Sequence, residues 1–175
     1  MRDERVFSLI ELLIIIAIMS TLTAIAILGT EGIRTGYRVR GATRLVYGDM
    51  QMARLIALKE GKEMAVEFIT GTPTTYCIKQ KATPGGDWDA GCDIGGNDTL
   101  DVIRKTVDLS SDYSGVTVNP TNLGNSIETA NERAEFNPNG TASSGSMTLS
   151  KDTRIQIICF TTGTGRVRIV DGTCS

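Results

Sequence analysis

The stretch VFSLIELLIIIAIM, residues 6–19, holds one carboxylate, Glu11, in an otherwise apolar run. From Leu12 to Thr30 the chain has no charged residue, and these nineteen positions approach the ~20 apolar residues that a helix needs to cross a bilayer. A cleaved secretory signal is the alternative, but it would have a shorter apolar core followed by a small-residue cleavage site. We therefore expect residues 7–30 to remain as a hydrophobic, membrane-spanning helix.

A helical pattern continues after this run, over residues 31–61. Apolar side chains recur there every three or four positions, as on one face of an amphipathic helix; they are Val39, Ala42, Val46, Met50, Ala53 and Ala57. Gly61 is a typical residue just beyond a helix end, with Lys59 in the last turn. The pattern predicts one long helix, roughly residues 8–60, weakened locally by its glycines.

Beyond Gly61 the apolar period changes from helical spacing to two. Short β-branched and aromatic segments, separated by Gly, Pro, Asn and Asp, predict strands throughout residues 62–175. The final pair, TRIQIICF and RVRIV, reads as a hairpin closed by TTGTG. The sequence therefore predicts an α+β fold in which a long N-terminal helix packs on an antiparallel β-sheet domain.

Four cysteines lie in the β-rich part: Cys77, Cys92, Cys159 and Cys174. An even number of cysteines in a polar domain is typical of disulfides formed in an oxidising compartment. Of the three possible pairings we favour Cys77–Cys92 and Cys159–Cys174, which close short local loops. Free buried thiols in a cytoplasmic domain are the alternative. The absence of histidine and of Cys-x-x-Cys spacing argues against structural zinc.

The segment DWDAGCDIGGND is a candidate for calcium binding, because it contains four carboxylates: Asp87, Asp89, Asp93 and Asp98. It departs from the EF-hand register, with Cys92 where the glycine belongs and Asp98 in place of the final glutamate. We expect an acidic loop in contact with solvent, and no metal or other cofactor.

Catalysis is the poorest hypothesis for this chain. It has no histidine for general-base chemistry, no phosphate-binding Walker loop and no G-x-S-x-G nucleophile motif. The net charge of −2 also gives no indication of a nucleic-acid-binding protein as a whole. We expect a protein that is not an enzyme.

Three stretches resemble a known superfamily. FSLIELLIIIAI resembles the N-terminal signature of type IV pilins and of type II secretion pseudopilins. MQMARLIALKEGKEMAVEF and FNPNGTASSGSMTLSKDTRIQIICFTTGTGRVRI resemble the GspH/FimT group of minor pilins. The resemblance covers residues 6–60 and about 136–169. It implies a pilin-like fold, with residues 1–6 as a prepilin leader and residues 62–175 as a periplasmic or extracellular domain.

The resemblance assigns a role to Glu11. A carboxylate inside hydrocarbon costs ~2.5–3.5 kcal/mol on insertion scales. In pilins a prepilin peptidase cuts before the phenylalanine, here between Val6 and Phe7, and leaves a methylated amine. Glu11 of one subunit would then pair with the amine of its neighbour, so residues 7–30 would anchor the subunit first and form the filament core later. The alternative is a carboxylate that snorkels to the headgroups.

The sequence and the family resemblance disagree about leader cleavage and about membrane topology. Val6 stands where the family has glycine before the cut, and the leader MRDERV mixes both charges, so the sequence leaves cleavage open. The arginines after the span outnumber those before it, which by the positive-inside rule favours an outside N-terminus. The resemblance implies the opposite, a single-pass inner-membrane protein with its cysteine-containing domain in the periplasm, and we adopt that orientation.

The GRVR motif suggests a second role. Arg166 and Arg168 are two apart on an expected strand and so share a face, with Arg154 on the strand opposite. Such a cluster can hold phosphates without reading sequence, and in FimT-like minor pilins this motif is associated with DNA binding for natural transformation. The alternative is a solvated strand face.

Taken together, these features predict a structural subunit that initiates or caps a type IV pilus or a pseudopilus. The expected partners are other pilin or pseudopilin subunits, the inner-membrane assembly platform and prepilin peptidase. A DNA-binding minor pilin and a type II secretion pseudopilin are the alternatives.

Overall fold

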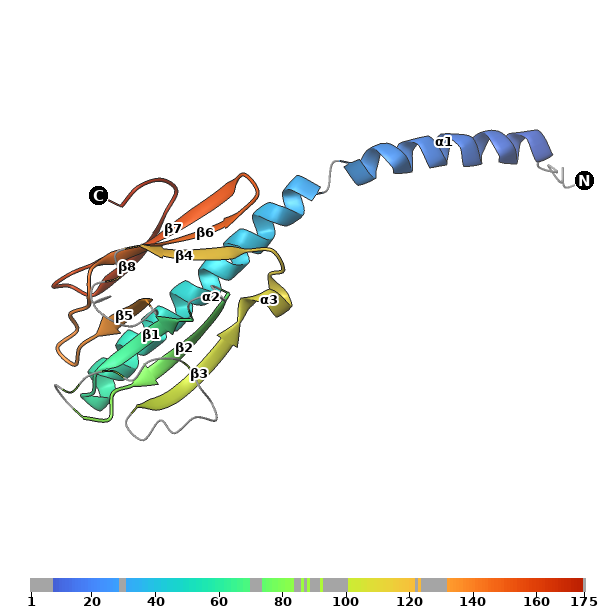
Figure 1. Ribbon diagram of the computed structural model, residues 1–175. Coiled ribbons are helices and arrows are strands. Elements are labelled where there is room, and N and C mark those ends of the chain that lie inside the picture. The colour runs from blue at the N-terminus through green and yellow to red at the C-terminus, as the bar shows by residue number, and fades with distance from the viewer. Residues whose placement is uncertain are drawn as a thin grey trace, which may run out of the picture. The chain divides into compact units, whose positions relative to one another are not determined.

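The structure is a computed structural model that describes residues 8–28, 31–69, 74–83, 86, 88, 92, 101–121, 123 and 132–174 (Figure 1). The chain divides into two compact units, Met1–Gly36 and Tyr37–Ser175. The division falls inside the second helix.

The first unit contains α1, Leu9–Leu28. Three hydroxyl side chains in this helix donate to carbonyls of the preceding turn: Ser20 to Ala17, Thr21 to Ile18 and Thr23 to Met19. Their polar groups are therefore satisfied within the helix itself, which suits a polar residue to apolar surroundings. Among the residues that the structure describes, no helix is both long enough and apolar enough to cross a membrane.

The second helix, α2, spans Glu31–Glu60. It begins after Gly29 and Thr30, which lie outside the described residues, so the predicted long helix is described as two helices. Its end is as predicted: Gly61 has a φ of +66° and donates to the Ala57 carbonyl. The predicted apolar stripe is also confirmed, because its side chains from Val39 to Ala57 are buried.

Two four-stranded antiparallel sheets form the rest of the second unit. The first sheet has the order β3-β2-β1-β5, with β1 at Met64–Phe68, β2 at Thr75–Gln80, β3 at Val102–Asp108 and β5 at Glu132–Phe136. The second has the order β4-β6-β7-β8, with β4 at Thr117–Thr121, β6 at Gly145–Lys151, β7 at Arg154–Thr161 and β8 at Arg166–Val170. The short α3, Leu109–Asp112, connects the two sheets. The predicted α+β fold and the predicted C-terminal hairpin are confirmed.

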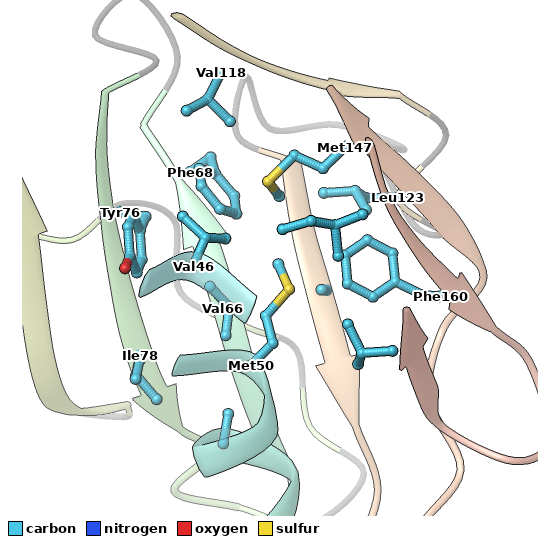
Figure 2. Close-up of a cluster of buried hydrophobic side chains, with 14 of the residues drawn as sticks. Val46, Met50, Val66, Phe68, Tyr76, Ile78, Val118, Leu123, Met147 and Phe160 are labelled. Atoms are coloured by element: carbon cyan, nitrogen blue, oxygen red, sulfur yellow. The ribbon is translucent and has the colours of Figure 1, made fainter. Parts of the chain in front are cut away.

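The core lies where α2 meets both sheets, as Figure 2 shows. Val46 and Met50 of α2 face Val66 and Tyr76 of the first sheet, while Met147 and Phe160 of the second sheet close the other side. Small residues on the helix stripe, among them Ala42, Ala53 and Ala57, are fully buried. They allow the helix backbone to approach the sheets closely.

Candidate functional site

Helix α1 has an apolar surface that the described residues of its own unit leave exposed. Its large side chains from Leu9 to Ile25 are all exposed, most by more than half. Glu11 lies in the first turn, where its backbone N–H donates to the Ser8 carbonyl at 3.0 Å. A carboxylate at this end is stabilised by the helix dipole. The predicted processing site, Val6 and Phe7, lies outside the described residues.

The three arginines proposed for phosphate binding are only partly brought together. Arg166 and Arg168 share one face of β8, opposite Thr161 and Cys159 of β7. Arg154 is at the other end of β7, five and seven residues from those partners, which is roughly 17 and 24 Å along a strand. These odd offsets also place it on the opposite face of the sheet. The structure thus provides a pair of arginines, one exposed and one half-buried, and not a cluster of three.

Both preferred disulfide pairings are present. Cys77 bonds to Cys92 and Cys159 to Cys174, with Cα atoms 5.7 and 5.8 Å apart. The first bond lies on the face of the first sheet that points away from α2, and Cys92 also contacts the Glu67 carbonyl. The second joins β7 to the C-terminal segment. Within the described residues no cysteine is free.

A charged pair is enclosed beside the first disulfide. Lys79 Nζ lies 2.9 Å from a Glu67 carboxylate oxygen, and both side chains are fully buried. Arg133 approaches the same carboxylate at 3.9 Å and bonds to Glu135 at 3.0 Å. The Trp88 ring lies against the Arg133 guanidinium. Trp88 and Cys92 therefore lie over a sheet face that carries these charges.

A second polar network joins α2 to the first sheet. The Tyr76 hydroxyl donates to the buried Asp49 carboxylate at 2.7 Å, and Lys105 Nζ contacts the same group at 2.6 and 2.8 Å. Burial, followed by the hydrogen bond to Asp49, raises the pKa of Tyr76. The hydroxyl thus remains a donor and fixes the helix on β2.

The glycine-rich turns of the C-terminal region pack on the last turns of α2. Gly165, with a φ of +59°, is so close to Gly140 that a Cβ would overlap the Gly140 carbonyl oxygen. Arg54 of α2 donates to the Thr164 carbonyl at 2.9 Å, and a Cβ at Gly140 would lie 3.3 Å from the Leu58 side chain. The segments FNPNG and GTGR therefore meet at one place on α2, and this packing explains Gly165.

Sequence reasoning missed these networks, although weak signals exist. Strand alternation turns Glu67 and Lys79 away from the apolar side, and only the cysteine spacing indicates that another segment covers them. Asp49 interrupts an apolar helix stripe next to Met50, which is a usable sign of a buried polar contact. The predicted calcium candidates, Asp87, Asp89, Asp93 and Asp98, lie outside the described residues. Within the described part of the chain, no group of side chains is suited to hold a metal ion.

An apolar N-terminal helix, followed by a helix that packs on an antiparallel two-sheet domain, defines the pilin-like class. The profile of the family described as "Type II transport protein GspH" matches residues 42–171. The chain therefore belongs to the GspH family.

Solved structures agree on the fold. The type IV minor pilin FimU of Pseudomonas aeruginosa is 13% identical, with a TM-score of 0.51 over 75% of this chain and 87% of that one. The minor pseudopilin EpsH of the Vibrio cholerae type II secretion system is 11% identical, with a TM-score of 0.50 over 80% of this chain and 98% of that one. No curated protein sequence is significantly similar to the chain.

Proposed function

We propose that the protein is a minor pilin or pseudopilin, a structural subunit of a type IV pilus or of a type II secretion pseudopilus. The observation that carries this proposal is the apolar surface of α1, whose large side chains from Leu9 to Ile25 are exposed. Membership in the GspH family and the likeness to FimU and EpsH support it. Such subunits act by assembling, which is why the proposal includes no catalytic residue and no cofactor.

Glu11 is the proposed assembly residue. It is the one charge in α1, and a chain cut between Val6 and Phe7 would place a positive amine one helical turn away. Pairing of this carboxylate with the amine of a neighbouring subunit would neutralise both charges where water is scarce. Prepilin peptidase and the inner-membrane assembly platform are the other proposed partners.

Before assembly, residues 7–30 would hold the subunit in the inner membrane as a single-pass protein. The uncharged run from Leu12 to Thr30 and the internally bonded hydroxyls of α1 support this role. The two disulfides support a periplasmic location for residues 62–175. A minor subunit of this kind would initiate or cap the filament.

The test is the Glu11→Ala variant in a host with pilus or pseudopilus genes. We expect the variant to reach the membrane but to be strongly depleted from the sheared filament fraction. Glu11→Asp is the matched control, because it keeps the charge. Equal incorporation of Glu11→Ala and the wild type would overturn the pairing, and the N-terminal mass of the recovered chain reports whether cleavage occurs at Phe7.

DNA binding through Arg166 and Arg168 stays a prediction. The two side chains share a face, but Arg154 lies apart from them. The choice between pilus and secretion system follows from which set of assembly genes accompanies this one.

A further inference from the structure

Basic side chains gather where α2 enters the second unit. Arg38, Arg40 and Arg44 are exposed there. Arg40 and Arg44 are four residues apart, so they share one helix face, where like charges repel and weaken the helix. In the described part of the chain, the ion pairs involve neither of them. The charges of Arg40 and Arg44 are therefore available to an anionic partner.

The turn between β6 and β7 adds positive charge at the same end of the unit. Lys151 Nζ donates to the Ser114 carbonyl at 2.5 Å, and Arg38 reaches the same oxygen at 3.5 Å. Two cations therefore share one neutral acceptor. Figure 1 shows the β6–β7 turn and α3 on either side of the first part of α2 in this unit. Segments 37–44, 109–115 and 150–155 together hold five basic residues and two acidic ones, Asp112 and Asp152.

An aromatic side chain accompanies the cations. Tyr37 is 70% exposed, one residue before Arg38 and only a few residues after the apolar N-terminal segment. Tyrosine together with arginine just beyond an apolar helix is typical of the headgroup region of a bilayer, where the ring is partly buried and the cations meet phosphates. Arginine also pairs with phosphate bidentately.

We propose that this basic end, defined by Tyr37, Arg38, Arg40, Arg44, Lys151 and Arg154, binds the headgroups of anionic phospholipids while the subunit waits in the membrane. The inference rests on the proposed membrane anchoring of residues 7–30. A phosphatidylglycerol headgroup fits this surface, because it has a phosphodiester with no ammonium group to oppose the arginines. Phosphatidylcholine carries such an ammonium group and is expected to bind more weakly.

The test uses the full chain, purified in a neutral detergent and titrated separately with phosphatidylglycerol and phosphatidylcholine. Bound lipids are counted by native mass spectrometry. We expect a preference for phosphatidylglycerol that weakens with added salt and falls about fivefold for each arginine removed in Arg40→Gln/Arg44→Gln. These arginines are chosen because Arg38 and Lys151 also bond to Ser114. Lys59→Gln/Lys62→Gln removes the same charge at the other end of α2 and should keep the preference.

Three results would overturn the proposal: no preference in the wild type, an unchanged preference in the arginine variant, or an equal loss in the lysine variant. An absent preference would assign the basic end to another partner, such as an acidic protein or DNA. Membrane recovery after an alkaline wash separates this failure from that of the proposed function. A chain that stays in the membrane without lipid preference contradicts only the headgroup proposal, whereas a chain released by the wash contradicts the anchoring itself.

Discussion

The two sheets of the second unit differ in how far the charged side chains on their outer faces are buried. In the first sheet, β1 is buried along its whole length, and Glu67 and Lys79 are fully enclosed on the face that points away from α2. In the second sheet, Arg166, Thr161 and Ile155 are exposed on the corresponding face, although Cys159, which is bonded to Cys174, is buried there. The two outer faces therefore differ because Trp88 and Cys92 lie over the charged residues of the first sheet, whereas the disulfide from Cys159 to the exposed Cys174 leaves Arg166 exposed on the second.

This difference separates structural charges from charges available to a partner. A buried ion pair fixes the arrangement of strands and is sensitive to the loss of either member. A charge on an open strand contributes little to stability. The first sheet should therefore respond to substitution by unfolding, while the second should tolerate changes on its outer face.

The largest effect is expected at Lys79. Lys79→Met leaves the Glu67 carboxylate buried without its 2.9 Å partner, although Arg133 remains at 3.9 Å, and should lower the free energy of unfolding by ~3–5 kcal/mol. The measurement is chemical unfolding of the full chain followed by circular dichroism. The double variant Glu67→Leu/Lys79→Met should recover most of the loss, because an apolar pair replaces the ionic one and Arg133 keeps Glu135. Equal losses in both variants would show that the pair is not enclosed.

Next in size is the effect of a methyl group at Gly165. A Cβ there would overlap the Gly140 carbonyl, and the positive φ adds strain, so Gly165→Ala should lose ~2–5 kcal/mol. Gly163 has a φ of +85° but open space around it. Gly163→Ala should therefore lose only ~1–2 kcal/mol in the same unfolding experiment. Equal losses would mean that backbone conformation, and not the contact between the two turns, explains the glycine.

Removal of each disulfide allows a direct comparison of the two sheets, because both disulfides have a sequence separation of 15. The entropy that a disulfide removes from the unfolded chain predicts that each bond stabilises the folded state by about 3 kcal/mol. Cys77→Ala/Cys92→Ala should lose at least that much, since it also releases the cover over Glu67 and Lys79. Cys159→Ala/Cys174→Ala should lose no more than that, because Cys174 lies in an exposed C-terminal segment. Thermal unfolding of the two variants tests this order, and the reverse order would contradict it.

The sequence predicted those parts of the fold that depend on local patterns. The stripe from Val39 to Ala57, the helix end at Gly61 and the hairpin closed by TTGTG each follow from spacing along a continuous segment. The cover over the first sheet does not, because strand alternation alone cannot tell a solvated face from one covered by a distant segment. The same limit applies to Arg154, whose distance from Arg166 depends on strand register rather than on residue type.

The smallest effect is expected at Arg166, on the open face of the second sheet. Arg166→Gln should change the free energy of unfolding by less than about 0.5 kcal/mol, because the side chain is exposed and lies opposite an exposed threonine. Arg168→Gln should cost more, because that side chain is half-buried and has a partner in the structure. Chemical unfolding of both variants checks the order. A large loss at Arg166 would place it among the structural charges, whereas none would leave its guanidinium free to serve a partner in assembly.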